Sequence, residues 1–257
     1  MRLPRRSFLR KAAVAALGFT IIPRHVLGRG FVPPSETLNH VIVGCGGISA
    51  MHSEPRMTGK NRIVGICDVD AQRVQKKLER IKQAGGGTPM TAEDFREVIA
   101  MPDADVVHVC TPPHWHGVIA AMAARRGKAV WCEKPLTRTI GEGLALSRVV
   151  QQTGVPFRVN TWFRLNRTNY YGVGPAREIR RVVASGVLGG PLTVRLAPVG
   201  GIQWKVNLWT GKPDLKPEPV PAHLNWDMYC GPAQLIPYHP HRCHGSFRGY
   251  WNFDQGG

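Results

Sequence analysis

Short apolar runs and longer segments with helical spacing alternate along the chain from His40 onward. Short continuous apolar runs are typical of strands that are buried on both faces of a sheet. We therefore expect strands at residues 40–44 (HVIVG), 62–68 (RIVGICD), 104–112 (ADVVHVCTP), 128–135 (KAVWCEKP) and 156–163 (PFRVNTWF).

The segments between these runs predict helices. Val74, Leu78 and Ile81 share one helical face, and TAEDFREVIA predicts a helix that opens at Thr91. Residues 115–127 and 141–154 each end on glycine, which is typical of a helix end. Alternation of buried strands and helices predicts an α/β fold, a doubly wound parallel sheet covering roughly residues 38–155.

After Pro156 the pattern changes. Residues 176–186 (AREIRRVVASG) predict a helix and residues 191–199 (PLTVRLAPV) a strand, before several tryptophans and a proline-rich stretch. We expect a second domain of the α+β class over residues 156–257.

The net charge of +17, from 34 basic and 17 acidic residues, raises the question of nucleic-acid binding. The basic excess is scattered, however, and no zinc-finger, RNA-recognition or basic-zipper pattern accompanies it. We therefore expect no nucleic-acid partner.

Residues 1–30 carry the features of a twin-arginine export signal. Arg5 and Arg6 precede Phe8 and Leu9, and a short apolar run follows to Ile22. The run is about half of what a membrane span needs, and a basic amphipathic helix is the alternative. The signal predicts the twin-arginine translocase as a partner and a periplasmic or otherwise exported protein. No cleavage pattern is evident before Gly28, so a cleaved and an uncleaved signal both remain open.

Six cysteines occur in the chain, and the first four fall within or just after the apolar runs. They are Cys45, Cys67, Cys110 and Cys132. This placement indicates buried small hydrophobic residues rather than a disulfide set.

A glycine-rich turn follows the first predicted strand in VIVGCGGISAMH. Gly44, Gly46 and Ser49 fit the pattern G-x-G-x-x-[G/A/S], and a helix beginning near Ile48 would direct its amides at a pyrophosphate. Asp68 closes the next strand, where a carboxylate would bind the adenosine ribose and disfavour a 2′-phosphate. We expect these residues and Gly47 to form an NAD site, with NADP as the less favoured cofactor. The alternative is a cluster of glycines that only forms a turn.

Two further stretches end strands at the same predicted edge. CTPPHWHG places Thr111, Pro112 and His116 where they could contact the cofactor, whereas His114 could equally cap or pack the following helix. VWCEKPL ends on Glu133 and Lys134. Lys134 could take a substrate hydroxyl proton or stabilise a developing alkoxide, and a surface ion pair is the alternative.

These motifs together, with WDMYCGPA and FRGYWNFDQGG, resemble the Gfo/Idh/MocA family of glucose–fructose oxidoreductase and inositol dehydrogenase-like enzymes. The resemblance implies an N-terminal Rossmann domain followed by an open, mainly antiparallel sheet. It implies NAD(P)-dependent redox chemistry on sugars and polyols, with Lys134 catalytic and Gly44, Gly46, Asp68 and Glu133 at the cofactor. It also implies homo-oligomers. The family pattern continues past the point where this sequence ends, at Gly257, so we expect a C-terminally truncated chain with an incomplete second domain.

The remaining candidates concern metal and substrate. His239, His241, Cys243 and His244 could be zinc ligands, but no second ligand pair is visible and we expect no metal. We expect the histidines to line the substrate or to lie in a loop. Aromatic faces and fixed polar donors suit a carbohydrate ring, and the residues we expect to line the substrate are Trp162, Arg164, Trp204 and Asn207.

The sequence thus favours an exported NAD-dependent oxidoreductase that acts on a sugar, cyclitol or related polyol. An NAD-requiring glycoside hydrolase of the same family is the first alternative. A non-catalytic fragment that binds the cofactor or nothing is the second.

Overall fold

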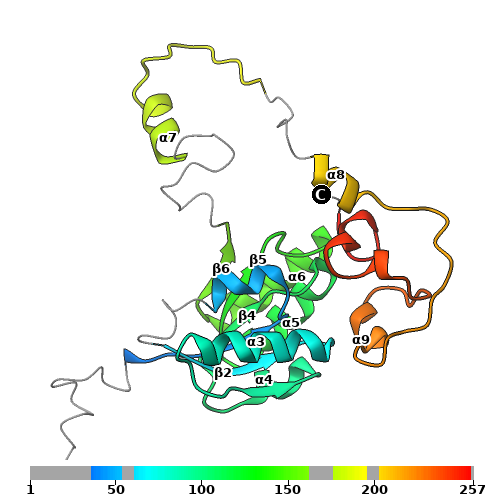
Figure 1. Ribbon diagram of the computed structural model, residues 1–257. Helices are drawn as coiled ribbons and strands as arrows, with labels where there is room; N and C mark the ends of the chain where they lie inside the picture. Colours follow the sequence, from blue (N-terminus) through cyan, green and yellow to red (C-terminus); the bar gives the residue numbers. More distant parts are fainter. Residues whose placement is uncertain (1–35, 54–60, 162–175, 196–202, 256–257) are drawn as a thin grey trace, which may run out of the picture. The chain divides into compact units, whose positions relative to one another are not determined.

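The computed structural model describes residues 36–53, 61–161, 176–195 and 203–255 (Figure 1). A six-stranded parallel sheet in the order β3-β2-β1-β4-β5-β6 occupies its first half. The strands are β1 Asn39–Val43, β2 Arg62–Cys67, β3 Met90–Ala92, β4 Val106–Val109, β5 Ala129–Glu133 and β6 Phe157–Asn160. The order reverses between β1 and β4, which is the switch point where doubly wound sheets bind ligands.

Helices cover both faces of the sheet. They are α3 Ala71–Gln83, α4 Phe95–Ala100, α5 Pro113–Arg125 and α6 Ile140–Thr153. One face, with Val41 and Val107, packs against α4, α5 and α6 in a continuous apolar core. On the other face, Ile42 and Ile66 pack against Ile81 of α3. Alternate residues of each strand point to opposite faces, so the continuous apolar runs supply both layers.

The second half contains the helices α7 Ala176–Ala184, α8 Gln203–Trp209 and α9 Trp226–Cys230, and the 3₁₀ turns η4 Pro240–Arg242 and η5 His244–Gly249. Trp226, Tyr229, Tyr238 and Phe253 form a separate aromatic core. Hydrogen bonds join this core to the sheet domain: the indole N–H of Trp115 donates to the carbonyl of Met228 at 3.0 Å. Residues 223–230 therefore lie against the starts of α3 and α5.

The structure corrects three sequence-based expectations. Thr91 lies in a short strand, and α4 begins only at Phe95 because Asp94 caps it. The glycine-rich turn leads into a 3₁₀ turn, η2 Gly47–His52, and residues 54–60 lie outside the described part. Residues 191–195 of the expected strand are exposed and form no strand, since no neighbouring strand is present among the described residues to pair with them.

Cys45, Cys67, Cys110 and Cys132 are free and buried, as predicted, and so are Cys230 and Cys243. Burial is the main cause that raises their pKa values; that of the Cys243 thiol rises to about 12. Among the described residues, no helix has the length and apolar character needed to cross a membrane.

Candidate functional site

The glycine loop, residues 44–47, joins β1 to η2. Gly44 has a φ of +95°, in the left-handed region that favours glycine. A Cβ there would lie 2.6 Å from the carbonyl carbon of Cys110 and 2.7 Å from the amide nitrogen of Thr111. A Cβ on Gly47, in contrast, would meet nothing within 4 Å. The loop thus presses against the end of β4 on one side and leaves open space on the other.

Asp68 follows β2 and holds the glycine loop in place. Its Oδ2 accepts a hydrogen bond from the Cys45 amide at 2.7 Å, and its Oδ1 accepts one from the Asp70 amide at 3.0 Å. Burial raises the pKa of Asp68, while these amides and nearby Arg73 act in the opposite direction. The same carboxylate lines the adjoining cavity, so it can both fix the loop and accept bonds from a ligand.

A cavity of about 300 Å³ runs along the carboxyl ends of β2, β1 and β4. One wall comes from the sheet domain and includes Gly44, Gly46, Gly47, Ile48, Thr111 and Pro112. The other wall comes from the second half of the chain and includes Leu224, Met228, Tyr229, His244, Phe247 and Arg248. The cavity size falls at the lower end of the range for small-molecule sites.

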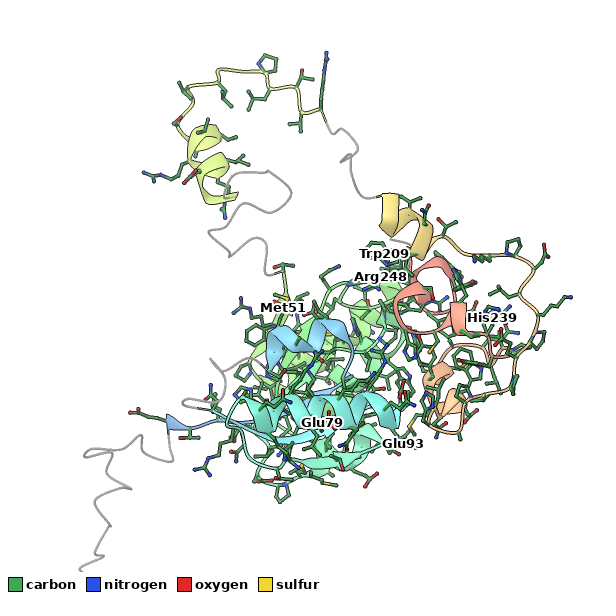
Figure 2. All side chains as sticks on the ribbon, in the orientation of Figure 1. Met51, Glu79, Glu93, Trp209, His239 and Arg248 are labelled. Atoms are coloured by element: carbon green, nitrogen blue, oxygen red, sulfur yellow. The ribbon has the colours of Figure 1, made fainter. Side chains whose placement is uncertain are left out.

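Charged side chains of both signs line this cavity. Asp68, Asp70 and Glu93 supply carboxylates, and Arg73 and Arg248 supply guanidinium groups. Figure 2 shows Arg248 beside Trp209, where its guanidinium lies 4.8 Å from the indole centre. Burial lowers the pKa of Arg248, and Asp254 opposes this shift.

Glu133 and Lys134 lie at the end of β5, one strand beyond β4, and neither lines the cavity. Glu133 is buried, whereas Lys134 is exposed and precedes Pro135 through a cis peptide bond. The positive charge of Lys134 acts to lower the pKa of buried Asp254, although burial raises that pKa overall. The C-terminal segment is held at this edge, because Gln255 donates to the carbonyl of Thr137 at 3.1 Å. The described structure therefore places a lysine, a buried glutamate and a buried aspartate close together.

His114 and His116 are both buried on α5 and have structural contacts. The two ring nitrogens of His116 lie 2.6 Å from the carbonyl oxygen of Pro135 and 2.7 Å from that of Thr111. His116 thus ties the ends of β4 and β5 together without lining the cavity. The ring of His114 lies 2.8 Å from the Tyr229 carbonyl through Nε2 and packs against Phe253.

His114 gives a testable dependence of stability on pH. Burial lowers its pKa from 6.5 to about 4 in the folded state. The folded state therefore favours the neutral ring. Its contribution to the stability of the fold is fully present above pH 6.5 and is lost as the pH falls toward 4, because the unfolded chain binds a proton that the folded chain does not. Replacing His114 with Phe is expected to reduce the loss of unfolding free energy between pH 7 and pH 5 by about 2 kcal/mol. Urea denaturation at the two pH values measures this difference, and equal losses in both proteins would contradict it.

The other candidates are distributed differently. Trp162 and Arg164 lie outside the described residues, and Trp204 and Asn207 lie on α8, with Asn207 exposed. His241 lies 2.7 Å from the Tyr250 hydroxyl through Nδ1, His244 contacts Asp70, and Cys243 is buried in the aromatic core. No cluster of three or more metal-ligating side chains forms within the described ranges.

Several residues of this site were not predicted from the sequence. Arg73 and Arg248 line the cavity, and His52 contacts Glu133. His244, a candidate in the sequence only as one of the four residues of the histidine and cysteine cluster, also lines the cavity. His52 lies within the glycine-rich stretch and Arg248 within FRGYWNFDQGG, so both were inside recognised motifs. Only the folded arrangement gives them these contacts.

The reversed strand order, the glycine loop and the carboxylate after β2 together define a Rossmann-type dinucleotide-binding domain. Family comparison agrees: residues 38–161 match the model described as "Oxidoreductase family, NAD-binding Rossmann fold". Residues 173–257 match "Oxidoreductase family, C-terminal alpha/beta domain" of the same family. The chain belongs to the Gfo/Idh/MocA oxidoreductase family.

Curated relatives include sugar and cyclitol dehydrogenases. The chain is 29% identical over 157 residues to scyllo-inositol 2-dehydrogenase (NAD(+)) of Bacillus subtilis, covering 59% of this chain and 41% of that protein. It is 27% identical over 160 residues to D-apiose dehydrogenase of Paraburkholderia graminis, covering 61% and 39%. A glycosyl hydrolase family 109 protein of Saccharopolyspora erythraea is 33% identical over 84 residues, covering 31% and 18%. The chain thus matches about two fifths or less of the length of these relatives.

Solved structures support the fold. WlbA dehydrogenase from Chromobacterium violaceum, in complex with NADH and UDP-GlcNAcA, matches with a TM-score of 0.50 and 19% identity, covering 66% of this chain and 44% of that one. A variant of KijD10, a 3-ketoreductase from Actinomadura kijaniata in complex with TDP-benzene and NADP, matches with a TM-score of 0.50 and 21% identity, covering 65% and 50%.

Proposed function

We propose that this protein is an NAD-dependent oxidoreductase that transfers hydride between the nicotinamide cofactor and a sugar, cyclitol or related polyol. The observation that carries the proposal is the position of Lys134. Lys134 directly follows β5, which pairs with β4. It therefore lies at the same edge of the sheet as the cavity beside the glycine loop. Sugar and cyclitol dehydrogenases among the relatives support the substrate class.

The residues of the cavity fit a dinucleotide. The glycine loop has room at Gly47 for close approach of a pyrophosphate, and the Asp68 carboxylate can accept hydrogen bonds from the adenosine ribose. With the pyrophosphate at the loop after β1 and the adenosine toward β2, the nicotinamide half extends toward β4 and β5. When bound, the nicotinamide supplies the hydride acceptor or donor.

Lys134 provides the proton chemistry in this proposal. Its Nζ can take the proton of a substrate hydroxyl during oxidation and return it to the carbonyl oxygen during reduction. The neighbours of Lys134 in sequence are fixed on both sides. Glu133 is buried and bonded to His52 and Asn160, and a ring nitrogen of His116 lies 2.6 Å from the Pro135 carbonyl oxygen.

A substrate screen tests the proposed activity. Purified protein with NAD and a panel of sugars and cyclitols is expected to form NADH, followed by absorbance, with at least one member of the panel. The proposal is overturned if dinucleotide binds but no member of a broad panel is oxidised and no corresponding ketone is reduced.

We propose that NAD is preferred over NADP because Asp68 follows β2, where the adenosine ribose would bind, and Asp70 and Glu93 are further carboxylates that line the cavity. Replacing Asp68 with Asn removes one negative charge and keeps an oxygen acceptor for one of the two amides, of Cys45 and Asp70, that the carboxylate binds. The ratio Kd(NADP)/Kd(NAD) is expected to fall by about ten-fold. Isothermal titration with each cofactor measures this ratio. If the substitution also loosens the glycine loop, both cofactors bind more weakly to the same extent and the ratio does not change. Tighter binding of NADP by the unmutated protein would refute the preference.

We propose export through the twin-arginine route, supported by the sequence around Arg5 and Arg6. Replacing both arginines with lysine keeps the charge and is expected to leave the protein in the cytoplasm. Cell fractionation with and without the substitutions measures this. Unchanged distribution of the variant would show that the arginine pair is not read as a signal.

A glycoside hydrolase activity is the second candidate, because family 109 glycosyl hydrolases are among the relatives. An enzyme of that kind would cleave a glycoside with bound NAD regenerated in each cycle. Release of sugar without accumulation of NADH would favour it over the dehydrogenase.

A further inference from the structure

A continuous chain of buried polar side chains crosses the face of the sheet that packs against α3 and η2. Nδ1 of His40 lies 2.7 Å from Nε2 of His108, and Nδ1 of His108 lies 2.9 Å from Nδ1 of His52. Nε2 of His52 then lies 2.7 Å from Oε1 of Glu133. We call His40, His108 and His52 the histidine chain. Each of these residues, and Glu133, is at most 6% exposed. The chain links β1, β4, η2 and β5.

The donors and acceptors of the chain follow from its last link. An ionised carboxylate only accepts, so His52 donates through Nε2 to Glu133. With all three rings neutral, one arrangement satisfies every link: His40 donates to His108, His108 donates to His52, and His52 donates to Glu133. His108 therefore fixes the tautomer of His52 that Glu133 requires.

The titration of these groups is consistent with that arrangement. Burial lowers the pKa of His40, against the influence of Asp105 and Asn61, and lowers the pKa of His108 well below its ordinary value. Burial would raise the pKa of Glu133, but hydrogen bonds from His52 and Asn160 outweigh it and the pKa is lowered. These shifts favour the neutral form of His40 and His108 and the ionised form of Glu133.

Packing around the chain keeps the rings in place. The indole of Trp131 stacks on His108, with ring centres 5.4 Å apart and planes at 28°, and meets the edge of His52 at 5.6 Å. The guanidinium of Arg158 lies 4.6 Å from the same indole centre. Asn160 of β6 donates a second hydrogen bond to Oε1 of Glu133.

A fixed negative charge at Glu133 has a consequence for the cofactor, if the dinucleotide binds as proposed above. Glu133 ends β5, toward which the nicotinamide half extends. The nicotinamide ring is positive in NAD⁺ and neutral in NADH, so a buried carboxylate on this side favours the oxidised form. We propose that His40, His108 and His52 are positioning residues that act through Glu133 to favour binding of NAD⁺ over NADH.

The test measures the ratio Kd(NADH)/Kd(NAD⁺) with the full chain, using NADH fluorescence and calorimetry for NAD⁺. Glu133→Gln is expected to lower this ratio at least about five-fold, and His52→Phe to lower it by a similar factor. His52→Gln is expected to restore most of it, because the amide can donate to Glu133 and accept from His108. His108→Phe, which leaves the direct contact intact, should give a smaller decrease.

Two comparisons separate this role from a general loss of packing. His114→Phe removes a buried histidine that is not part of the histidine chain, and we expect it to leave the ratio Kd(NADH)/Kd(NAD⁺) unchanged. In a Glu133→Gln background, His52→Phe should lower the ratio no further, because the carboxylate through which it acts is gone.

The outcomes distinguish this inference from the proposed function. Failure of the unmutated protein to bind either nicotinamide form would overturn both. If binding persists, a ratio unaffected by Glu133→Gln, or a full additional effect of His52→Phe in the Glu133→Gln background, overturns the inference alone. If His52→Phe fails to fold, Glu133→Gln and His108→Phe test the inference instead. It is overturned if neither variant lowers the ratio.

Discussion

Replacing Lys134 with Met is expected to lower turnover of the sugar or cyclitol substrate about 10²- to 10⁴-fold, the usual contribution of a positioned acid–base group. Binding of the dinucleotide is expected to change by less than about five-fold, because the glycine loop and Asp68 hold it without help from Lys134. Steady-state rates and cofactor titrations on the same preparations measure the two effects.

Lys128 offers a matched control at the other end of the same strand. Its ammonium donates to the carbonyl of Met101 at 2.9 Å, at the edge of the sheet opposite the cavity. Lys128→Met removes the same charge and is expected to keep turnover within about two-fold of the unmutated enzyme. Equal activities of the Lys134→Met and unmutated proteins would show that Lys134 is not the acid–base group.

Replacing Gly44 with Ala is expected to destabilise the fold by about 2–5 kcal/mol and to abolish measurable dinucleotide binding. The backbone at Gly44 is left-handed, and the added methyl group would collide with the backbone of Cys110 and Thr111. Either the loop or the end of β4 must move, and both line the cavity. Denaturation and cofactor titration measure the two losses.

Gly47→Ala is the control within the same loop. It needs no left-handed backbone, and its methyl group would meet no protein atom within 4 Å. Its stability is expected to match the unmutated protein within about 0.5 kcal/mol, while dinucleotide binding weakens because the methyl enters the space for the pyrophosphate. If Gly44→Ala unfolded at the same denaturant concentration as Gly47→Ala, the close contact of Gly44 with the end of β4 would not constrain the loop as proposed.

The doubly wound sheet could be predicted because its long strands are continuous apolar runs. Residues 41–43 and 106–109 are buried on both faces, which leaves little choice other than a parallel sheet. β3 could not be found in this way. It has three residues, Met90 and Thr91 are exposed, and it is stabilised by pairing with β2 rather than by burial.

The candidate site could be predicted only in part. Motif spacing identified Gly44, Asp68 and the edge that carries Lys134, because each follows directly after an apolar run. The histidine chain was not predicted, since His40 and His108 meet only through the register between β1 and β4. The cavity wall formed by residues 224–248 depends on how a distant segment docks, and no local pattern encodes that docking.

We propose above all that the cavity beside the glycine loop binds a nicotinamide dinucleotide. Calorimetric titration of the purified chain with NAD and NADH, repeated with Gly47→Ala, tests it most directly. We expect saturable binding of one dinucleotide per chain, with an affinity at least about ten-fold weaker in Gly47→Ala although the variant folds normally. Absence of binding to either form at millimolar concentration, or equal affinity in the unmutated protein and Gly47→Ala, would contradict it.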